Sequence, residues 1–236
     1  MKSMHAHFVV AAALIVGLWS CSLTAQAQGY YINPNMYSNM YAVNAAQLAQ
    51  NLQFAARIKS LKDQQAAFAN APKARHDLPA APRAPFSATD FKPTGRRDAP
   101  QRLAAQVKDP ALRPQITQLA REVLAAFEKE PTFRKNNLAY AFTVYLAGSL
   151  QVVSGQEFDE AASEALTQWI NDEMVAAGAV EKLGPAQRTQ LYDVLLLQGG
   201  LIVGIAQAGA DNHDDEQVKL AKTMARDALA TFGISL

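Results

Sequence analysis

Apolar residues recur at three- and four-residue spacing through most of the second half of the chain, and this period predicts amphipathic α-helices. The first predicted helix begins at Pro114 and stops before Pro131, with an apolar face between Ile116 and Phe127. The second runs from about Arg134 to Val153 and is apolar on both sides. We therefore expect the second helix to be the central one.

Three more helices complete the pattern. Ser154 to Glu157 match a capping box that starts the third helix, and Gly178 ends it. Its expected inward face consists of Phe158, Ala162, Ala165, Leu166, Trp169 and Ile170. The fourth helix starts at Gly184-Pro185 and the fifth near Asp214. Residues 111–236 are thus predicted to form an all-α, five-helix bundle-like domain.

The fourth helix carries the most apolar run after the N-terminus, from Leu191 to Val203, which we judge too short and interrupted to span a membrane. Gly199, Gly200 and Gly204 lie in or next to this run. Each glycine costs roughly 1 kcal/mol relative to alanine inside a helix, so we predict close packing against another helix there. A ligand channel is the alternative.

The N-terminus has the pattern of an export signal. A lysine-bearing start, an apolar run from Phe8 to Trp19 and the Ala-x-Ala site at residues 25–27 predict a signal peptide, residues 1–27, cleaved after Ala27. The minor alternative is a lipoprotein processed at Cys21, the only cysteine of the chain. Either way, the protein is expected to be exported, to the periplasm or out of the cell.

Two segments separate the signal peptide from the helical domain. Residues 28–70 contain a polar-aromatic stretch and then an amphipathic helix, expected over 42–69, with Ala45, Leu48, Leu52 and Ala55 on one side. Six prolines between Pro72 and Pro100 predict that residues 71–110 are an extended, basic, Pro-rich linker.

Charge divides the chain. Residues 28–111 hold eleven Lys and Arg against five Asp, whereas residues 112–236 hold ten basic and sixteen acidic residues. A basic arm on an acidic body suggests an anionic envelope component or a protein as partner. The alternative is that the arm folds back onto its own body or stays solvated. No specific nucleic-acid motif is present.

Candidate chemistry is sparse. After signal removal, His76 and His213 are the only histidines, so we predict no metal, no cofactor and no catalytic residue. The acidic residues between Asp211 and Glu216 are expected to cap a helix rather than bind calcium. Glu157, Glu160 and Glu164 share a helix face that we interpret as solvated.

One polar set is more informative. Asn136, Tyr140 and Thr143 lie on the central helix in an apolar neighbourhood, where Tyr192 and Asp193 are expected to join them. Buried polar groups need hydrogen-bond partners, so these five residues form either a structural network or the lining of a small pocket.

Three parts of the body resemble a known family: Asn136 to Ala141, Gly155 to Phe158, and Leu191-Tyr192-Asp193 followed by Gly199-Gly200. The chain resembles, over roughly Pro100 to Leu236, a family of exported bacterial proteins known only as a domain of unknown function. That family's pattern has Asn-Asp before the Ala-Tyr-Ala segment, where this chain has Asn136-Asn137. The resemblance implies an all-helical exported domain and supplies no reaction or substrate.

These observations favour an exported, non-enzymatic interaction or structural protein of the bacterial envelope, whose oligomeric state is left open. Two alternatives belong to other classes. One is a small-ligand-binding domain built around Asn136, Tyr140 and Tyr192. The other is a cell-wall hydrolase that uses carboxylates such as Glu157 and Glu160.

Overall fold

The computed structural model describes residues 83–107, 109–156, 158–232 and 234. The predicted signal peptide, the polar-aromatic segment and the helix over 42–69 lie outside these residues. Within them, the protein contains seven α-helices, two short 3-10 helices and no strand. The prediction of an all-α fold is therefore confirmed for the described part of the chain.

Five long helices form the body, in close agreement with the expected positions. They are α5 (Arg113–Lys129), α6 (Leu138–Ser154), α7 (Glu160–Ala176), α9 (Pro185–Asp211) and α10 (Asp215–Thr231). Two short helices, α4 (Ala99–Ala105) and α8 (Ala179–Lys182), were not expected. The 3-10 helices are η2 (Phe86–Thr89) and η3 (Pro110–Leu112).

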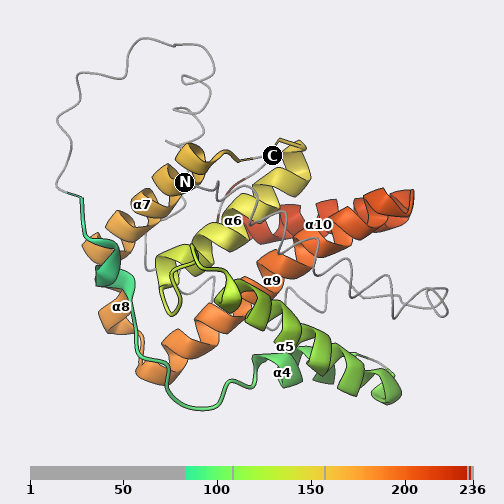
Figure 1. The fold of residues 1–236 in the computed structure, drawn as a ribbon, viewed down its shortest axis with the longest axis horizontal. Coiled ribbons are helices and arrows are strands. Elements are labelled where there is room, and N and C mark those ends of the chain that lie inside the picture. The colour runs from blue at the N-terminus through green and yellow to red at the C-terminus, as the bar shows by residue number, and fades with distance from the viewer. Residues whose placement is uncertain (1–82, 108, 157, 233, 235–236) are drawn as a thin grey trace, which may run out of the picture.

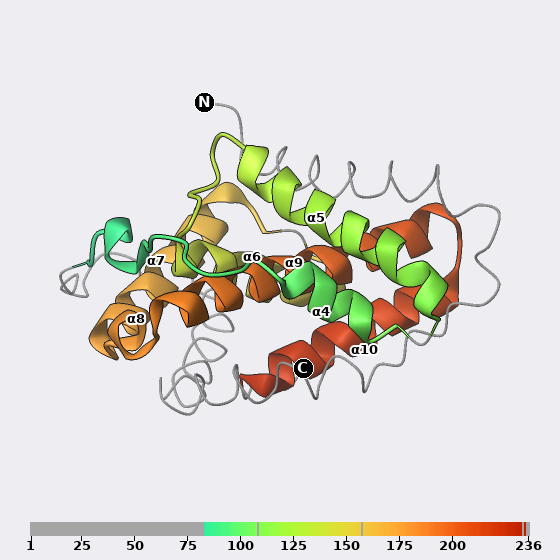
Figure 2. The same cartoon turned by 90° about the horizontal axis from the view of Figure 1, so that it is seen from below.

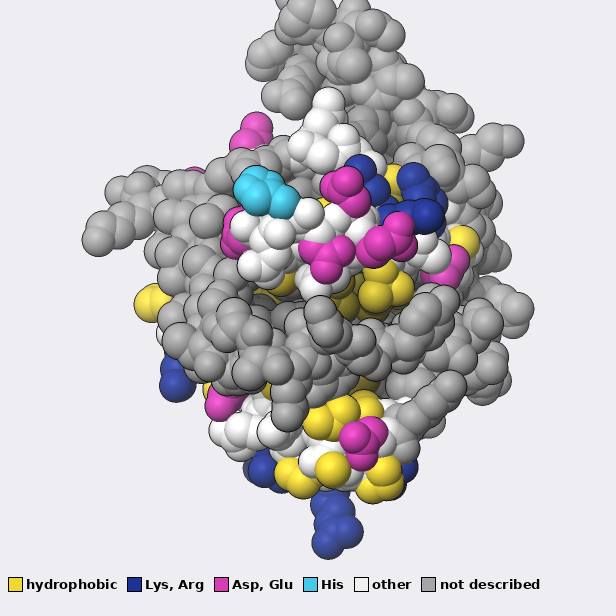
Figure 3. All heavy atoms as spheres, turned by 90° about the vertical axis from the view of Figure 1, so that its right-hand side faces the viewer, with side chains coloured by type: hydrophobic (Ala, Val, Ile, Leu, Met, Phe, Trp, Pro, Cys, Tyr) yellow, Lys and Arg dark blue, Asp and Glu magenta, His cyan; other side chains and the backbone are white. Residues whose placement is uncertain are grey.

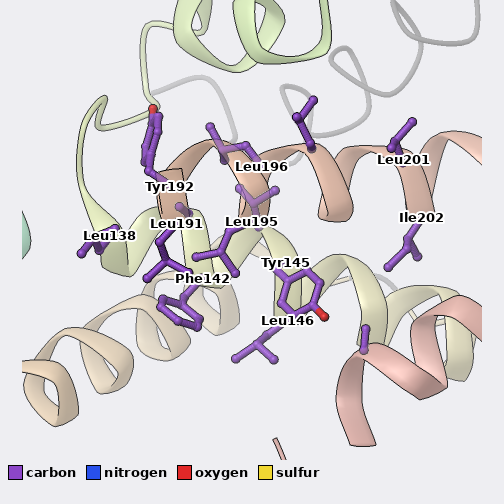
Figure 4. Packing of buried hydrophobic residues seen from close by; sticks show 14 of the residues in the cluster. Leu138, Phe142, Tyr145, Leu146, Leu191, Tyr192, Leu195, Leu196, Leu201 and Ile202 are labelled. Carbon is purple, nitrogen blue, oxygen red and sulfur yellow. The ribbon is translucent and has the colours of Figure 1, made fainter. Parts of the chain in front are cut away.

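The core is built around α6 and α9, which run through the middle of the domain in both views (Figures 1 and 2). α10 contacts both of them, α7 packs on α6, and α5 packs on α9 with α4 beside it. α6 is buried nearly all round, from Leu138 to Ser149, so it is the central helix that its two apolar sides predict. Leu191 and Leu195 of α9 lie next to Phe142 of α6 (Figure 4).

Glycine permits the closest approach in this core. A Cβ built on Gly199 would lie 3.0 Å from the Tyr145 Cα and 3.0 Å from the Val144 carbonyl oxygen, which belong to the backbone of α6. At Gly200 the neighbours are side chains, with the Val123 Cγ1 at 2.8 Å. Gly204 is also buried in α9. The two central helices thus meet backbone to backbone at Gly199.

The long helix α9 corrects one expectation. It continues through its glycines for 27 residues, which is long and apolar enough to cross a membrane by length and composition alone. However, 67% of its most apolar window is buried inside the domain. α9 is therefore the core helix of this fold, and its apolar residues face other helices.

The start of the third predicted helix, α7, also differs from the prediction. Ser154 does not begin the third helix: α6 extends through it, and its hydroxyl donates to the Leu150 carbonyl at 2.7 Å. The N-cap of α7 is Asp159, which accepts from the Ala162 amide at 2.7 Å. An aspartate one turn later offers the same kind of acceptor, so the capping box has no function here.

α7 is rotated relative to the expectation. Its buried residues are Ser163, Thr167, Ile170, Asn171 and Met174. Ala162 and Ala165, which were predicted to face inward, are exposed, and Leu166 and Trp169 are half-buried. The core side of α7 thus combines Ile170 and Met174, both 0% exposed, with polar residues, of which Thr167 and Asn171 find hydrogen-bond partners there.

The segment before α4 is not the extended spacer that its prolines predict. Residues 83–98, which we call the strap, lie along the domain from α7 to α4 (Figure 1). Pro100 stands in the first turn of α4, where the missing amide proton costs nothing. Hydrogen bonds to α6, α7 and α9 hold the strap, and the prolines supply an extended backbone that can follow the surface.

Candidate functional site

The strap meets the body at two polar anchors, of which the first is centred on Asn137. This residue is the N-cap of α6, is fully buried and accepts from the Tyr140 amide at 3.0 Å. Its amide nitrogen donates to the Phe86 carbonyl at 2.7 Å and to the Asp90 carboxylate at 2.8 Å. One asparagine side chain therefore both starts the central helix and binds the strap.

Two further buried residues complete this anchor. The Thr89 hydroxyl lies 2.8 Å from the Asn171 side-chain oxygen and 3.1 Å from that of Asn137. Asn171 in turn donates to the Ala84 carbonyl at 3.0 Å. Thr89 and Asn171 are both 0% exposed. Because a buried polar group that loses a partner is destabilised, removing any one of these side chains weakens the hydrogen bonding of its neighbours.

The second anchor is an ion pair between the strap and the core helix α9. The Arg97 Nε donates to both carboxylate oxygens of Asp193 at 3.1 Å, and a terminal nitrogen of Arg97 lies 2.7 Å from the Glu128 carboxylate of α5. The Asp193 side chain is 1% exposed and that of Arg97 is 36% exposed. A two-oxygen contact of this kind holds the guanidinium plane in one orientation.

The surroundings shift both pKa values upward. Burial raises the pKa of Asp193, and the hydrogen bonds from Arg97 oppose this rise. The Asp193 carboxylate in turn raises the pKa of Arg97. Asp193 is the only charged side chain that is fully buried among the described residues. Its charge therefore depends on the arginine that the strap supplies.

Aromatic rings fill the space between the two anchors. Phe91 of the strap lies edge-on to Tyr192, with ring centroids 5.4 Å apart, and the Phe133 ring contacts both Tyr140 and Tyr192. Phe86 of the strap is 5.6 Å from Tyr140. Such pairs contribute about 0.5–1.5 kcal/mol each beyond the area that they bury.

The Tyr192 hydroxyl points away from Leu191 and Leu195 (Figure 4) and is buried without a hydrogen bond among the described residues. Burial raises the pKa of Tyr192, while the nearby Asn136 backbone lowers it. A phenol of raised pKa stays protonated at neutral pH, so it is not placed to act as a base.

The five residues of the predicted polar set do not share one cluster. Tyr140 and Tyr192 meet through the Phe133 ring, and Asn136 accepts from the Phe91 amide with its backbone carbonyl at 2.9 Å. Thr143 instead faces α7, where its hydroxyl lies 2.9 Å from that of Thr167. Asp193 belongs to the Arg97 anchor.

Apart from Asp193, which belongs to the predicted polar set, the residues that hold the strap were missed at the sequence level. Asn137 gives one usable signal, because asparagine directly before an apolar helical run is a preferred N-cap. Arg97, Thr89 and Asn171 give none, since their partners lie between 48 and 96 residues away in the sequence. Long-range polar pairs leave no local pattern to read.

The acidic residues before α10 are accounted for by capping. Asp214 accepts from the amides of Glu216 and Gln217, both at 3.1 Å, and so it is the N-cap that the sequence predicts. No group of three or more potential metal ligands occurs among the residues that the structure describes.

Comparison with known proteins identifies the family of the chain. Residues 3–235 match a family of unknown function, DUF6683. The chain belongs to this family. The match spans the strap and all the helices, and it extends beyond the region from Pro100 to Leu236 that carries the resemblance in the sequence. No curated protein and no solved structure matches the chain.

Proposed function

We propose that this DUF6683 member is an exported, non-enzymatic interaction protein of the bacterial envelope. In this proposal, the helical body is a docking module and the basic N-terminal arm contacts an anionic component of the envelope. The observation that carries the proposal is the engagement of Asp193. A buried carboxylate held through both oxygens by Arg97 serves the attachment of the strap and is not free for proton transfer.

The described part of the arm supports contact with an anion. Arg97 is used internally, but Arg83, Lys92 and Arg96 are exposed on the strap. Figure 3 shows the face of the body that lies at the right-hand side of Figure 1. By contrast with the strap, acidic and basic side chains are interspersed on this face. The strap carries four basic and two acidic residues, and such an excess of one sign attracts a counter-charged surface more strongly than a balanced mixture does.

The test is co-sedimentation of the purified chain from Gln28 onward with envelope fractions of the host, at low and at high salt. We expect binding at low salt that salt weakens, because surface electrostatics are screened within about 10 Å at 0.1 M ionic strength. A triple change of Arg83, Lys92 and Arg96 to Gln should reduce binding strongly.

The matched control changes three basic residues of α10, Lys219, Lys222 and Arg226, to Gln, which removes the same charge from the body. Equal losses in the two triple variants would show that net charge alone attracts the protein, and would refute a role for the arm. Absence of binding at low salt would remove the proposal's main support.

A further inference from the structure

The outer side of α7 carries a stripe of small and apolar side chains. Ala162, Ala165 and Ala176 are exposed there, and Leu166 and Trp169 are half-buried on the same side. Spacings of three, four and seven residues place these side chains along one stripe of the helix. The side of α7 that faces the core carries Ser163, Thr167, Ile170, Asn171 and Met174. The outer stripe thus exposes small alanines, while its two large residues, Leu166 and Trp169, are only partly covered by the core against which they pack.

We propose that the segment 42–69 of this same chain docks as an amphipathic helix on this outer face of α7. The small residues of the stripe let a second helix approach closely, as glycine does between α6 and α9. Val175, on the flank of the same helix, is the only large hydrophobic side chain that is strongly exposed among the described residues, at 39%. A docked helix would cover this region.

The described part of the chain begins beside the proposed face. The strap begins against α7: the Ala84 amide donates to the Asp172 carboxylate at 2.8 Å, and the Gln168 side chain donates to the Ala84 carbonyl at 2.9 Å. Figure 1 shows α7 at the edge of the domain, where the strap starts. Segment 42–69 is therefore tethered to a point that lies next to the proposed face.

The tether is long enough. Thirteen residues separate position 69 from Arg83, and three of them are prolines. An extended proline-rich chain of that length spans about 40 Å, whereas a helix of the length of α7 measures about 25 Å. Short tethers give effective concentrations in the millimolar range, which favours this segment over a second copy at ordinary protein concentrations.

The charges are complementary as well. α7 contains Glu160, Glu164, Asp172 and Glu173 and no basic residue. Segment 42–69 contains Arg57, Lys59 and Lys62 against one acidic residue, Asp63. Opposite charges beside an apolar contact fix its orientation and discourage wrong pairings.

Trp169 offers a direct test, because it is the only tryptophan in the chain from Gln28 onward. We expect Leu48→Asp with Leu52→Asp, on the predicted apolar stripe, to shift the Trp169 emission to longer wavelength. The matched control, Gln50→Asp with Gln53→Asp, adds the same charge on the opposite side of the predicted helix and should leave the emission unchanged. Identical spectra for both variants and the parent chain would overturn the proposal.

Disulfide trapping identifies the occupant, since the chain from Gln28 onward contains no cysteine. Ala165→Cys on α7, combined with Ala55→Cys in the segment, should form a bond within one chain at a rate independent of protein concentration. Ala230→Cys on α10, another exposed helical alanine, is the control for Ala165→Cys and should not be trapped. A disulfide-linked dimer would assign the face to a second copy, and the absence of any product would exclude the segment; either result overturns the proposal.

Discussion

Replacement of Arg97 by Met tests whether the strap stabilises the domain through the buried charge of Asp193. The variant keeps an apolar stem of similar length but removes the guanidinium from a carboxylate that is 1% exposed. Breaking a buried pair by removing one partner typically costs about 3–5 kcal/mol, because the remaining charge is left without compensation. We expect a loss of that size in the free energy of unfolding at pH 7.

A second arginine of the same molecule provides the control. Arg134 makes the same kind of two-oxygen contact with Asp90, but their side chains are 41% and 38% exposed. Exposed ion pairs contribute about 0–1 kcal/mol, so Arg134→Met should change the stability little. Urea unfolding of both variants, followed by circular dichroism at the helical band, gives the comparison directly.

The loss of unfolding free energy caused by Arg97→Met should become smaller as the pH falls. Burial already raises the pKa of Asp193, so the folded protein binds a proton more readily than the unfolded chain does. Stability from this group therefore increases as the pH falls through the raised pKa. Without Arg97 the pKa of Asp193 rises further. The difference in unfolding free energy between the parent protein and the variant should therefore become smaller on acidification from pH 7 to about pH 4.5.

The double variant Arg97→Met with Asp193→Asn removes the buried carboxylate charge as well as the arginine that pairs with it. It should recover most of the unfolding free energy that Arg97→Met alone loses. The reasoning is refuted if Arg97→Met costs no more than Arg134→Met, or if its deficit is the same at both pH values. Either result would show that Asp193 is solvated or paired in another way.

Three further predictions use the same unfolding measurement. Gly199→Ala should cost about 1–3 kcal/mol, because its Cβ would lie 3.0 Å from the backbone of α6; an unchanged stability would contradict the close approach. Asn137→Ala should lower the free energy of unfolding by about 2–4 kcal/mol, since it removes an N-cap and two hydrogen bonds to the strap. The control Asn212→Ala, at an exposed site, should change it by no more than about 0.5 kcal/mol. Tyr192→Phe should be neutral or stabilising by up to about 1 kcal/mol, because the hydroxyl is buried without a hydrogen bond among the described residues; a clear loss would reveal a hidden partner.

Helix positions could be predicted from the sequence because they depend on local periodicity. α10 illustrates this: Ala221, Met224, Ala225, Ala228 and Leu229 recur at three- and four-residue spacing in the sequence, and the structure buries all five. Apolar spacing and an aspartate at the start of the helix were sufficient there.

α7 shows where the same method fails. Ala162 and Ala165 of its expected inward face are exposed, while Ser163, Thr167 and Asn171 face the core together with Ile170 and Met174. Hydrophobic periodicity assigns the apolar side to the interior, and it cannot register hydrogen-bond partners that other segments supply. Thr167 meets Thr143 of α6, and Asn171 meets Thr89 of the strap, and neither pairing has a local signature.

The proline-rich segment fails as a spacer for a related reason. Proline excludes regular helix and sheet interiors, but it does not prevent an extended chain from binding a surface. In the strap, Thr89 and Arg97 supply side-chain contacts to the body, and Pro100 begins α4. Composition predicts the backbone conformation of such a segment well and predicts its contacts poorly.

The long helix α9 carries a buried charge that the strap compensates. By length and composition it could cross a membrane, yet it carries Asp193 in its first half, fully buried among apolar residues. A carboxylate in that position is costly unless a cation reaches it, and the cation comes from Arg97, which lies 96 residues earlier in the sequence. The strap is therefore part of the core helix's environment, and a chain shortened to begin at α5 would leave that charge unpaired. This is why the folded unit must include the strap as well as the five long helices.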